Sequence, residues 1–462
     1  MIITVRVEIM NILKTLKKHN KKEKVSFHMP GHKQGSAFKG SELESRIWKF
    51  DTTELTDTDC LIDPKDCIKR AEDKATEIYG AEKSFFLVNG ATCGILSMFY
   101  AAFNEGDKVL ICRDCHRSVI SAMIITGVEP VYVEPIIHES GFSCGVSSDA
   151  IKEALDANEN VKGVFITSPT YFGISSDIKT IADVVHEKGA LLMVDEAHGA
   201  HFPFSDKFPK GAMECGADIS VVSLHKSMPC PNQTAVLNLG RCSISANKMK
   251  NAINIFQTTS PSYIMMSAME YALDIGYKDG KKLTDEILTY RTESEYIFTF
   301  DDPFKLLLDF RERGYNGYEV AEILENKFGI FSELAIESCV LLMISWGNTV
   351  KDFLILEKAI DYISMLPPKE FKKSHTINYV GGECVKTPKE VLRGDMEKVS
   401  FKAAEGRISA REVTIFPPCI PIFMPGERIL KEHIEIINNA INSNLTITGI
   451  DEGLIYVTKE DN

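Results

Sequence analysis

The spacing of apolar residues changes repeatedly between residues 60 and 240, and each change marks a predicted boundary between elements. Short apolar runs predict strands, and apolar residues three and four positions apart predict helices. Strands are predicted over 84–88, 108–112, 130–133, 161–167, 191–195 and 219–224. Helices are predicted over 68–79, 118–126 and 178–188, and glycines end the first and the last of them.

The alternation of strands and helices predicts an α/β fold, with a mostly parallel sheet in the large domain that helices cover on both faces. In such sheets ligands bind beyond the carboxyl ends of the strands. Five residues with polar side chains lie at or just after these predicted ends: Asn89, His116, Thr167, Asp195 and Lys226. We therefore expect one functional site along this edge.

The pattern changes past residue 285, where short strands and helices mix, and Pro367-Pro368 begins a polar stretch. Prolines around residues 416–425 exclude regular helix or central strand there. We predict an N-terminal segment over 1–50, a large domain over 51–285, a small α/β domain over 286–370 and a C-terminal domain over 371–462. Together the last two form a smaller α+β region.

Composition narrows the possible partners. The chain has 462 residues, of which 44% are hydrophobic, and a formal net charge of −13. That charge argues against binding to nucleic acid or to an anionic membrane surface. No apolar run reaches the roughly 20 residues of a membrane span, and the N-terminus lacks the pattern of a secretion signal, so we expect a cytoplasmic protein.

The cysteines do not suggest a disulfide framework or a metal site. Twelve are scattered along the chain, and the spacing of Cys112 and Cys115 has no second ligand pair to complete a zinc site. We expect reduced thiols and no bound metal.

A lysine and an aspartate of this region carry candidate chemistry. Lys226 follows one predicted strand, and Asp195 ends another. A lysine amine can form an imine with an aldehyde, and a carboxylate can keep a pyridine nitrogen protonated so that the ring accepts electrons. Taken singly, they read as a solvated lysine and a helix-capping aspartate. Their order and surroundings predict a pyridoxal phosphate site.

A phosphate group would find donors nearby. The turn from Asn89 to Thr92 joins a predicted strand to a helix, where backbone N–H groups favour an anion and the Thr92 hydroxyl adds a donor. Ser223 and His225 flank Lys226 and supply further donors. His116 is either a ring that stacks on the cofactor or a structural histidine.

Seven segments, taken in order, resemble the bacterial ornithine/lysine/arginine decarboxylases, which are pyridoxal-phosphate enzymes of the aspartate-aminotransferase-like fold, fold type I. They cover residues 27–35, 86–94, 115–118, 167–171, 195–201, 223–229 and 259–263. Residues 406–410 and 417–427 resemble the C-terminal signature of that family. The length resembles the shorter branch found in Gram-positive bacteria.

The resemblance implies roles for individual residues. Lys226 would carry the Schiff base, Asp195 would contact the pyridine nitrogen, and His116 would stack on the ring. The remaining implied cofactor contacts are Ala91, Thr92, Ser223, His225, His198 and Thr258. The position of Thr258 matches one that reaches the cofactor of the partner subunit, which implies a homodimer, or a higher homo-oligomer, with shared active sites.

The resemblance further implies decarboxylation of a basic L-amino acid to its amine, for polyamine metabolism. Arginine and lysine are favoured over ornithine. An acidic side chain would pair with the distal cation of the substrate, and the candidates are Glu427, Glu54, Asp57 and Asp59.

Departures from the family pattern put substrate identity in question. Cys419 replaces an expected glycine, Phe416 replaces a tyrosine, and the sequence of residues 56–61 differs. The alternatives are another fold-type-I enzyme, such as an aminotransferase or a carbon–carbon or carbon–sulfur lyase, and an inactive regulatory homologue.

Overall fold

The structure is a computed structural model. It describes residues 11–21, 28–30, 32–291, 293–371, 380–416, 420–442 and 446–459. Cys419 lies outside these residues, as do Phe27, Gly31 and Pro417 of the family-like segments.

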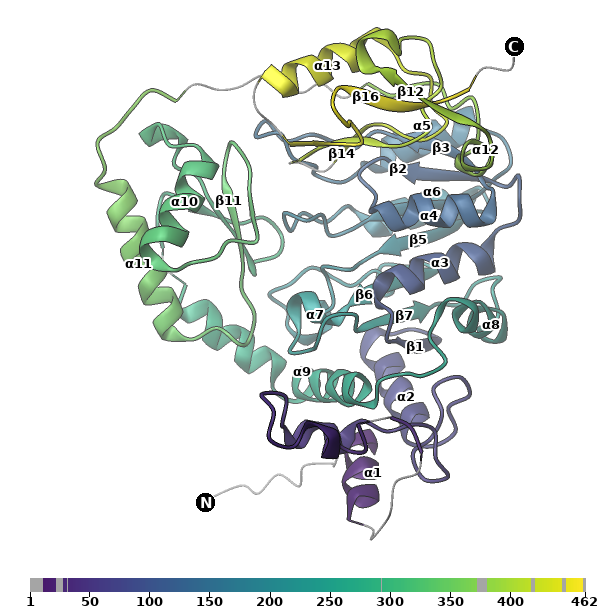
Figure 1. The fold of residues 1–462 in the computed structure, drawn as a ribbon, viewed down its shortest axis with the longest axis vertical. Helices are drawn as coiled ribbons and strands as arrows, with labels where there is room; N and C mark the ends of the chain where they lie inside the picture. Colours follow the sequence, from purple (N-terminus) through teal and green to yellow (C-terminus); the bar gives the residue numbers. More distant parts are fainter. Residues whose placement is uncertain are drawn as a thin grey trace.

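A seven-stranded sheet forms the centre of the described chain, with strand order β1-β7-β6-β5-β4-β2-β3 (Figure 1). Its strands are β1 (Lys83–Leu87), β2 (Lys108–Cys112), β3 (Glu129–Val133), β4 (Val161–Thr167), β5 (Leu191–Asp195), β6 (Ile219–Ser223) and β7 (Ala235–Leu239). β7 is antiparallel to both β1 and β6, so β1 runs in the same direction as β6. The other pairs are parallel, and the expected mostly parallel sheet is confirmed.

Successive apolar side chains of the strands point to opposite faces of the sheet and build two cores. One face packs against α3 (Gly90–Ala102), α4 (Arg117–Thr126) and α8 (Ala246–Phe256). The other face is covered by α2 (Cys67–Tyr79), α5 (Ser148–Ala157), α6 (Ile178–Glu187) and α9 (Tyr263–Thr289). Because both faces are covered, the strands are apolar along most of their length.

The chain leaves this layered core along α9 and enters a smaller layer (Figure 1). A four-stranded sheet of order β10-β11-β9-β8 packs there against two helices. The elements are β8 (Ile297–Phe298), β9 (Lys305–Leu308), α10 (Gly317–Phe328), β10 (Leu334–Ala335), β11 (Val340–Met343) and α11 (Val350–Ser364).

The C-terminal part covers the β3 side of the central sheet (Figure 1). It has its own apolar core between two small sheets and α13. Its elements are α12 (Pro388–Arg393), β12 (Met396–Ser400), β13 (Val413–Phe416), β14 (Ile420–Phe423), α13 (Lys431–Asn442), β15 (Thr446–Thr448) and β16 (Leu454–Thr458). The predicted domain boundaries stay predictions.

One segment differs from the sequence-based expectation in a way that affects the site. Lys226 lies on the short helix α7 (Leu224–Ser227), one turn beyond β6. Within the N-terminal segment lies α1 (Asn11–Asn20), whose first backbone N–H groups donate to the carboxylate of Glu270 on α9. The N-terminal part is thereby anchored to the core.

Among the described residues, no helix has both the length and the apolar character needed to cross a bilayer. The described cysteines are free thiols, and Cys112 and Cys115 are buried in the two cores. No cluster of three or more potential metal ligands occurs in the described part of the chain.

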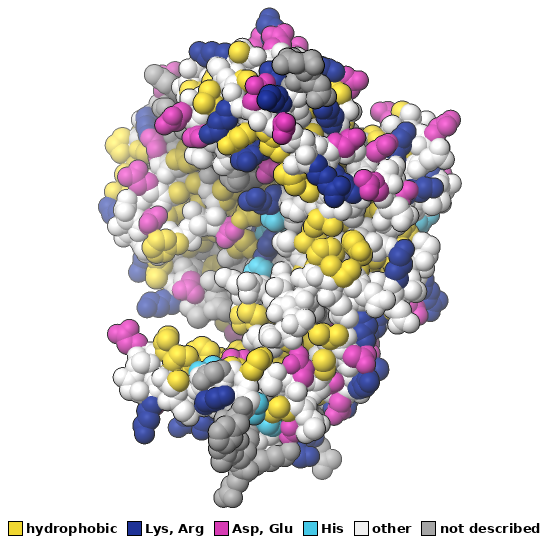
Figure 2. All heavy atoms as spheres, turned by 45° about the vertical axis from the view of Figure 1, so that its right-hand side comes forward, with side chains coloured by type: hydrophobic (Ala, Val, Ile, Leu, Met, Phe, Trp, Pro, Cys, Tyr) yellow, Lys and Arg dark blue, Asp and Glu magenta, His cyan; other side chains and the backbone are white. Residues whose placement is uncertain are grey.

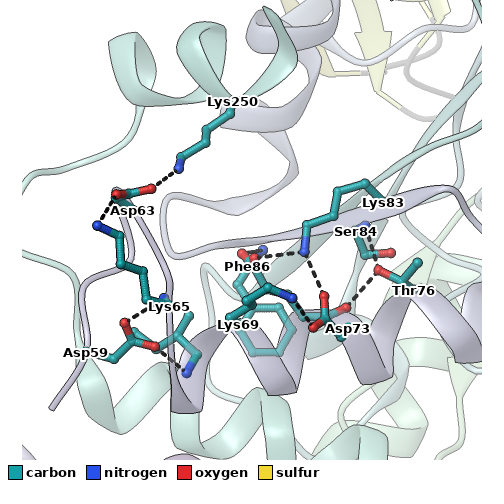
Figure 3. A network of polar contacts seen from close by, with 12 residues as sticks. Asp59, Asp63, Lys65, Lys69, Asp73, Thr76, Lys83, Ser84, Phe86 and Lys250 are labelled. Carbon is teal, nitrogen blue, oxygen red and sulfur yellow. Dashed lines mark hydrogen bonds and ion pairs between the residues drawn. The ribbon is translucent and has the colours of Figure 1, made fainter. Parts of the chain in front are cut away.

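Polar contacts hold α2 against β1 (Figure 3). Lys83 of β1 pairs with Asp73 of α2 at 3.1 Å, and its amine lies 3.5 Å from the Glu72 carboxylate. Glu72 is buried, and its Oε1 accepts the backbone N–H of Phe86 at 3.0 Å. Burial raises the pKa of the Glu72 carboxyl to about 7, although Lys83 and the Phe86 N–H oppose the shift.

This buried carboxyl should make stability depend on pH. The unfolded chain releases the proton near pH 4.5 and the folded chain near pH 7, so stability is lost as the pH rises through this interval, by roughly 3 kcal/mol. Glu72→Gln keeps the acceptor for Phe86 but removes the titration. As the pH rises from 5 to 8, we expect the free energy of unfolding of this variant, measured with urea, to exceed that of the wild type by a growing margin. Glu77→Gln, at an exposed position of the same helix, is the control; equal pH dependence of all three proteins would contradict the assignment.

Candidate active site

The strand directions bring the carboxyl ends of β1, β2, β4, β5 and β6 to one edge of the sheet. The residues at or after these ends are Asn89, His116, Thr167, Asp195 and Ser223. Figure 2 shows that one face of the molecule is hollowed and that histidine and basic side chains are exposed within the hollow.

Asp195 is the last residue of β5 and is buried. Its Oδ1 accepts the backbone N–H of Ala197 at 3.0 Å, which fixes the carboxylate at the sheet edge. Thr167 is its direct neighbour on β4, and the buried Thr167 hydroxyl has no hydrogen-bond partner among the described residues. A buried carboxylate beside an unsatisfied hydroxyl is suited to bind a polar or cationic group.

Nζ of Lys226 lies 3.0 Å from Nε2 of His198. Burial lowers the pKa of the Lys226 amine, and the negative charges of Asp195 and Glu333 oppose this shift. A larger fraction of the amine is therefore neutral at physiological pH than for an exposed lysine, which suits a nucleophile.

His198 contacts a second lysine that sequence reasoning missed. Its Nδ1 lies 2.9 Å from Nζ of Lys305, which is 1% exposed at the start of β9. Burial, together with the charges of Lys305 and Lys226, lowers the pKa of His198 well below its usual range, so the imidazole is neutral. The available signal was a lysine at the start of an otherwise apolar strand.

His116 caps the N-terminus of α4, where its Nδ1 accepts the backbone N–H of Ser118 at 3.2 Å. The side chain is exposed, yet partial loss of water lowers its pKa, and the Asp195 charge opposes that effect while Lys226 adds to it. With Nδ1 accepting, Nε2 carries the proton of the neutral ring. A ring that stacks on a cofactor would be held in place by this cap.

The predicted phosphate-binding residues lie around the N-terminus of α3. Gly90 has a φ of +74°, a conformation that favours glycine, and donates its N–H to the carbonyl of Gln233 at 2.7 Å. Ala91 is partly exposed and Thr92 exposed. Backbone N–H groups at the start of a helix of this length are suited to a phosphate.

The other predicted phosphate donors come from the β6–α7 turn. Ser223 is buried, and Nδ1 of His225 donates to the carbonyl of Thr234 at 3.1 Å. Thr258 is exposed, and its N–H donates to Oδ1 of Asn89 at 3.0 Å, so it lies beside the α3 turn.

These residues fit pyridoxal phosphate on chemical grounds. The amine of Lys226 has a lowered pKa, the Asp195 carboxylate is buried, and the Thr167 hydroxyl is unsatisfied. Together with the N–H groups of α3, they offer a partner for the aldehyde, the ring nitrogen and the phosphate.

Of the carboxylates expected to pair with a substrate cation, Asp57 and Asp59 are used in local structure. Asp57 pairs with Nδ1 of His19 at 3.1 Å. Asp59 accepts backbone N–H groups at the start of α2, including that of Ile68 at 2.9 Å (Figure 3). Oε1 of Glu54 is buried without a partner among the described residues, so Glu54 remains a candidate.

Glu427 is fully buried and holds Arg113, which lies just beyond β2. Two bonds of 2.9 and 2.6 Å join the guanidinium to the carboxylate, and the backbone N–H of Met424 donates to the same carboxylate at 2.6 Å. Arg113 also pairs with Glu134 at 2.8 Å. Through Arg113, Glu427 tethers the C-terminal part to the central sheet. Because both of its carboxylate oxygens already accept hydrogen bonds, we do not assign Glu427 a substrate contact.

Comparisons with known proteins show which family and which relatives the chain is similar to. A family model described as Orn/Lys/Arg decarboxylase, major domain, matches residues 11–299, and one for the C-terminal domain matches residues 375–445. An uncharacterized protein, YaaO, of Bacillus subtilis is 35% identical over 97% of this chain and 99% of its own length. An arginine decarboxylase of Bacillus subtilis is 30% identical over 96% of both chains.

Solved structures support the fold. The lysine decarboxylase of Francisella novicida superposes with a TM-score of 0.84 at 19% identity, over 98% of this chain and 81% of that chain. The constitutive lysine decarboxylase of E. coli gives 0.82 at 18% identity, over 98% and 82%. The expected fold class is thereby confirmed.

The tethering role of Glu427 can be separated from substrate binding. Glu427→Gln leaves the buried Arg113 without its main counter-charge, and we expect a loss of about 3 kcal/mol in urea unfolding. Michaelis constants of the folded fraction should not change. Arg113→Met combined with Glu427→Leu should recover part of the stability. A raised Michaelis constant with unchanged stability would contradict the tethering role.

Proposed function

The chain belongs to the Orn/Lys/Arg decarboxylase family, and on this premise we propose that it decarboxylates a basic L-amino acid with pyridoxal phosphate as its cofactor. The observation that carries the proposal is the placement of the Lys226 amine, with its lowered pKa, at the sheet edge where the buried carboxylate of Asp195 also lies. The product would be the corresponding amine, and we propose that it supplies polyamine metabolism.

Arginine is the favoured substrate, because relatives named arginine decarboxylase match almost their whole length at about 30% identity. Lysine is second, since several more distant relatives are named lysine decarboxylases. Ornithine is the third candidate.

The bound cofactor supplies a ring that withdraws the electron pair left at Cα when carbon dioxide departs. In this proposal Asp195 holds a proton on the ring nitrogen, and Lys226 anchors the aldehyde end. His116 would stack on the ring. The phosphate would be held by the start of α3, at Ala91 and Thr92, and by the β6–α7 turn. The proton that Cα receives comes from His116 or Lys226, which are both kept as candidates.

For the distal cation of the substrate we favour Glu333, just before β10. Its carboxylate accepts the hydroxyl of Tyr171, whose ring meets His198 edge-on with centroids 4.7 Å apart. The negative charge of Glu333 opposes the lowering of the pKa of Lys226 and Lys305 that burial causes. An exposed carboxylate at this position can pair with an incoming guanidinium or ammonium group.

The proposal includes a cytoplasmic homodimer with shared active sites. Thr258 is exposed at the edge of the α3 turn, a position from which it could reach a second subunit. His198 is kept as a cofactor contact because it adjoins Lys226.

An aminotransferase is less well supported. An aminotransferase usually places an arginine against the α-carboxylate. The signature arginine of the C-terminal part, Arg407, instead donates to Glu397 at 2.6 Å and to the carbonyl of Thr458 at 2.9 Å. An inactive regulatory homologue is disfavoured because Lys226 and Asp195 are both retained.

The function is tested by carbon dioxide release and amine identification with L-arginine, L-lysine and L-ornithine separately. We expect release from one substrate, dependent on added pyridoxal phosphate, and loss of at least a thousandfold in Lys226→Ala. Cofactor binding without release from any of the three would instead indicate cleavage of a different bond.

The substrate pocket is tested by comparing Glu333→Gln with Glu54→Gln. Loss of the Glu333 charge should raise the Michaelis constant about tenfold with a smaller change in kcat, corresponding to about 1.4 kcal/mol of binding. The amide oxygen still accepts the Tyr171 hydroxyl. An increase confined to Glu54→Gln would transfer the role to Glu54.

A further inference from the structure

Three side-chain nitrogen groups form a continuous line from the sheet edge to the smaller layer. Nζ of Lys226 lies 3.0 Å from Nε2 of His198, and Nδ1 of the same ring lies 2.9 Å from Nζ of Lys305. His198 and Lys305 are both buried. Lys226 comes from α7 and Lys305 from β9, so the line joins the two main parts of the chain.

The Lys305 side chain is closely packed and 1% exposed. Gly173, with a φ of +83°, passes so close that a Cβ there would lie 2.7 Å from Cγ of Lys305. The backbone N–H of Lys305 donates to the carbonyl of Asp302 at 3.1 Å. The hydrogen bond to His198 is therefore made in a closely packed, buried setting.

The neighbouring charges favour an ammonium on Lys305. Asp302 is fully buried and accepts Nε2 of His201 at 3.1 Å. Burial raises the pKa of the Asp302 carboxyl, but His201 and Lys305 outweigh it, so the net direction is downward and the group is ionised. Burial lowers the pKa of Lys305 to about 8 while Asp302 opposes this, so the amine is still mostly charged at neutral pH.

The charge on Lys305 sets the direction of both hydrogen bonds. An ammonium can only donate, so Nδ1 of His198 accepts and the proton of the neutral ring lies on Nε2. Nε2 then donates to the lone pair of the Lys226 amine. In the opposite tautomer of His198, with the proton on Nδ1, Nε2 would accept a hydrogen bond from Lys226. That arrangement would favour the ammonium form of Lys226.

We infer that Lys305 is a positioning residue that acts through His198 to keep Lys226 neutral and ready to attack an aldehyde. The inference rests on the proposed cofactor and adds to it a residue outside the family-like segments. The titratable groups around Lys226, His198 and Lys305 are Asp195, His116, His201, His225, Asp302 and Glu333.

The test measures how fast pyridoxal phosphate becomes attached to Lys226 in the full-length chain freed of cofactor. In this step the neutral amine adds to the aldehyde carbon and water leaves. Attachment is trapped with borohydride at a series of pH values and quantified on the peptide that carries Lys226. No amino-acid substrate is present, so decarboxylation does not affect the result.

In Lys305→Met we expect the pH of half-maximal rate to rise by at least one unit, which slows attachment about tenfold or more at pH 7. Lys305→Arg keeps a cation and a donor and should stay within about threefold of the wild type. Lys358→Met, at an exposed position of α11, should not differ from the wild type.

A pH profile of Lys305→Met that coincides with the wild-type profile would overturn the inference. If that variant does not fold by circular dichroism, Lys305→Leu, which also removes both the charge and the donor, replaces it under the same criterion. A wild-type chain that attaches the cofactor at Lys226 but releases no amine would refute the proposed function alone. A wild-type chain that attaches no cofactor would refute both.

Discussion

The site depends on the cost of removing charged groups from water at the carboxyl edge of the sheet. Asp195, His198, Asp302 and Lys305 are all buried there. A buried charge is tolerated only beside a partner of opposite charge or several hydrogen bonds, and otherwise its pKa shifts until it is neutral. His198, Lys226 and Lys305 meet this constraint together. The neutral His198 ring accepts a hydrogen bond from Lys305 on one side and donates one to Lys226 on the other. The reactivity of Lys226 therefore follows from the packing of its neighbours as much as from its own position.

Much of the fold could be predicted from the sequence because buried parallel strands have a strong local pattern. The predicted strands over 108–112, 161–167 and 191–195 coincide with β2, β4 and β5. The family assignment is likewise confirmed. The turn after β6 was less predictable, since its four-residue helix is too short to show a period, and it places Lys226 beyond the strand end.

Contacts between distant segments could not be predicted. Lys305 meets His198 across 107 positions of sequence, and periodicity within a single element contains no information about such a pair. Glu427 was assigned to the substrate because an acidic residue in a signature segment suggests chemistry, whereas its partner Arg113 lies 314 positions earlier. Asp59 resembles a candidate acid in sequence, but the turn before α2 uses its carboxylate to satisfy backbone N–H groups.

The pairing of Arg113 with Glu427 also has a consequence for the order of assembly on the ribosome. Synthesis proceeds at about 5–20 residues per second, so the 314 positions between the two residues take on the order of 15–60 s to add. During that time the central sheet can form, but the guanidinium beyond β2 still lacks its main counter-charge. The nascent protein must keep this edge hydrated until the C-terminal part with Glu427 emerges. Closure of the edge of the sheet by the C-terminal part is therefore a late event in biosynthesis.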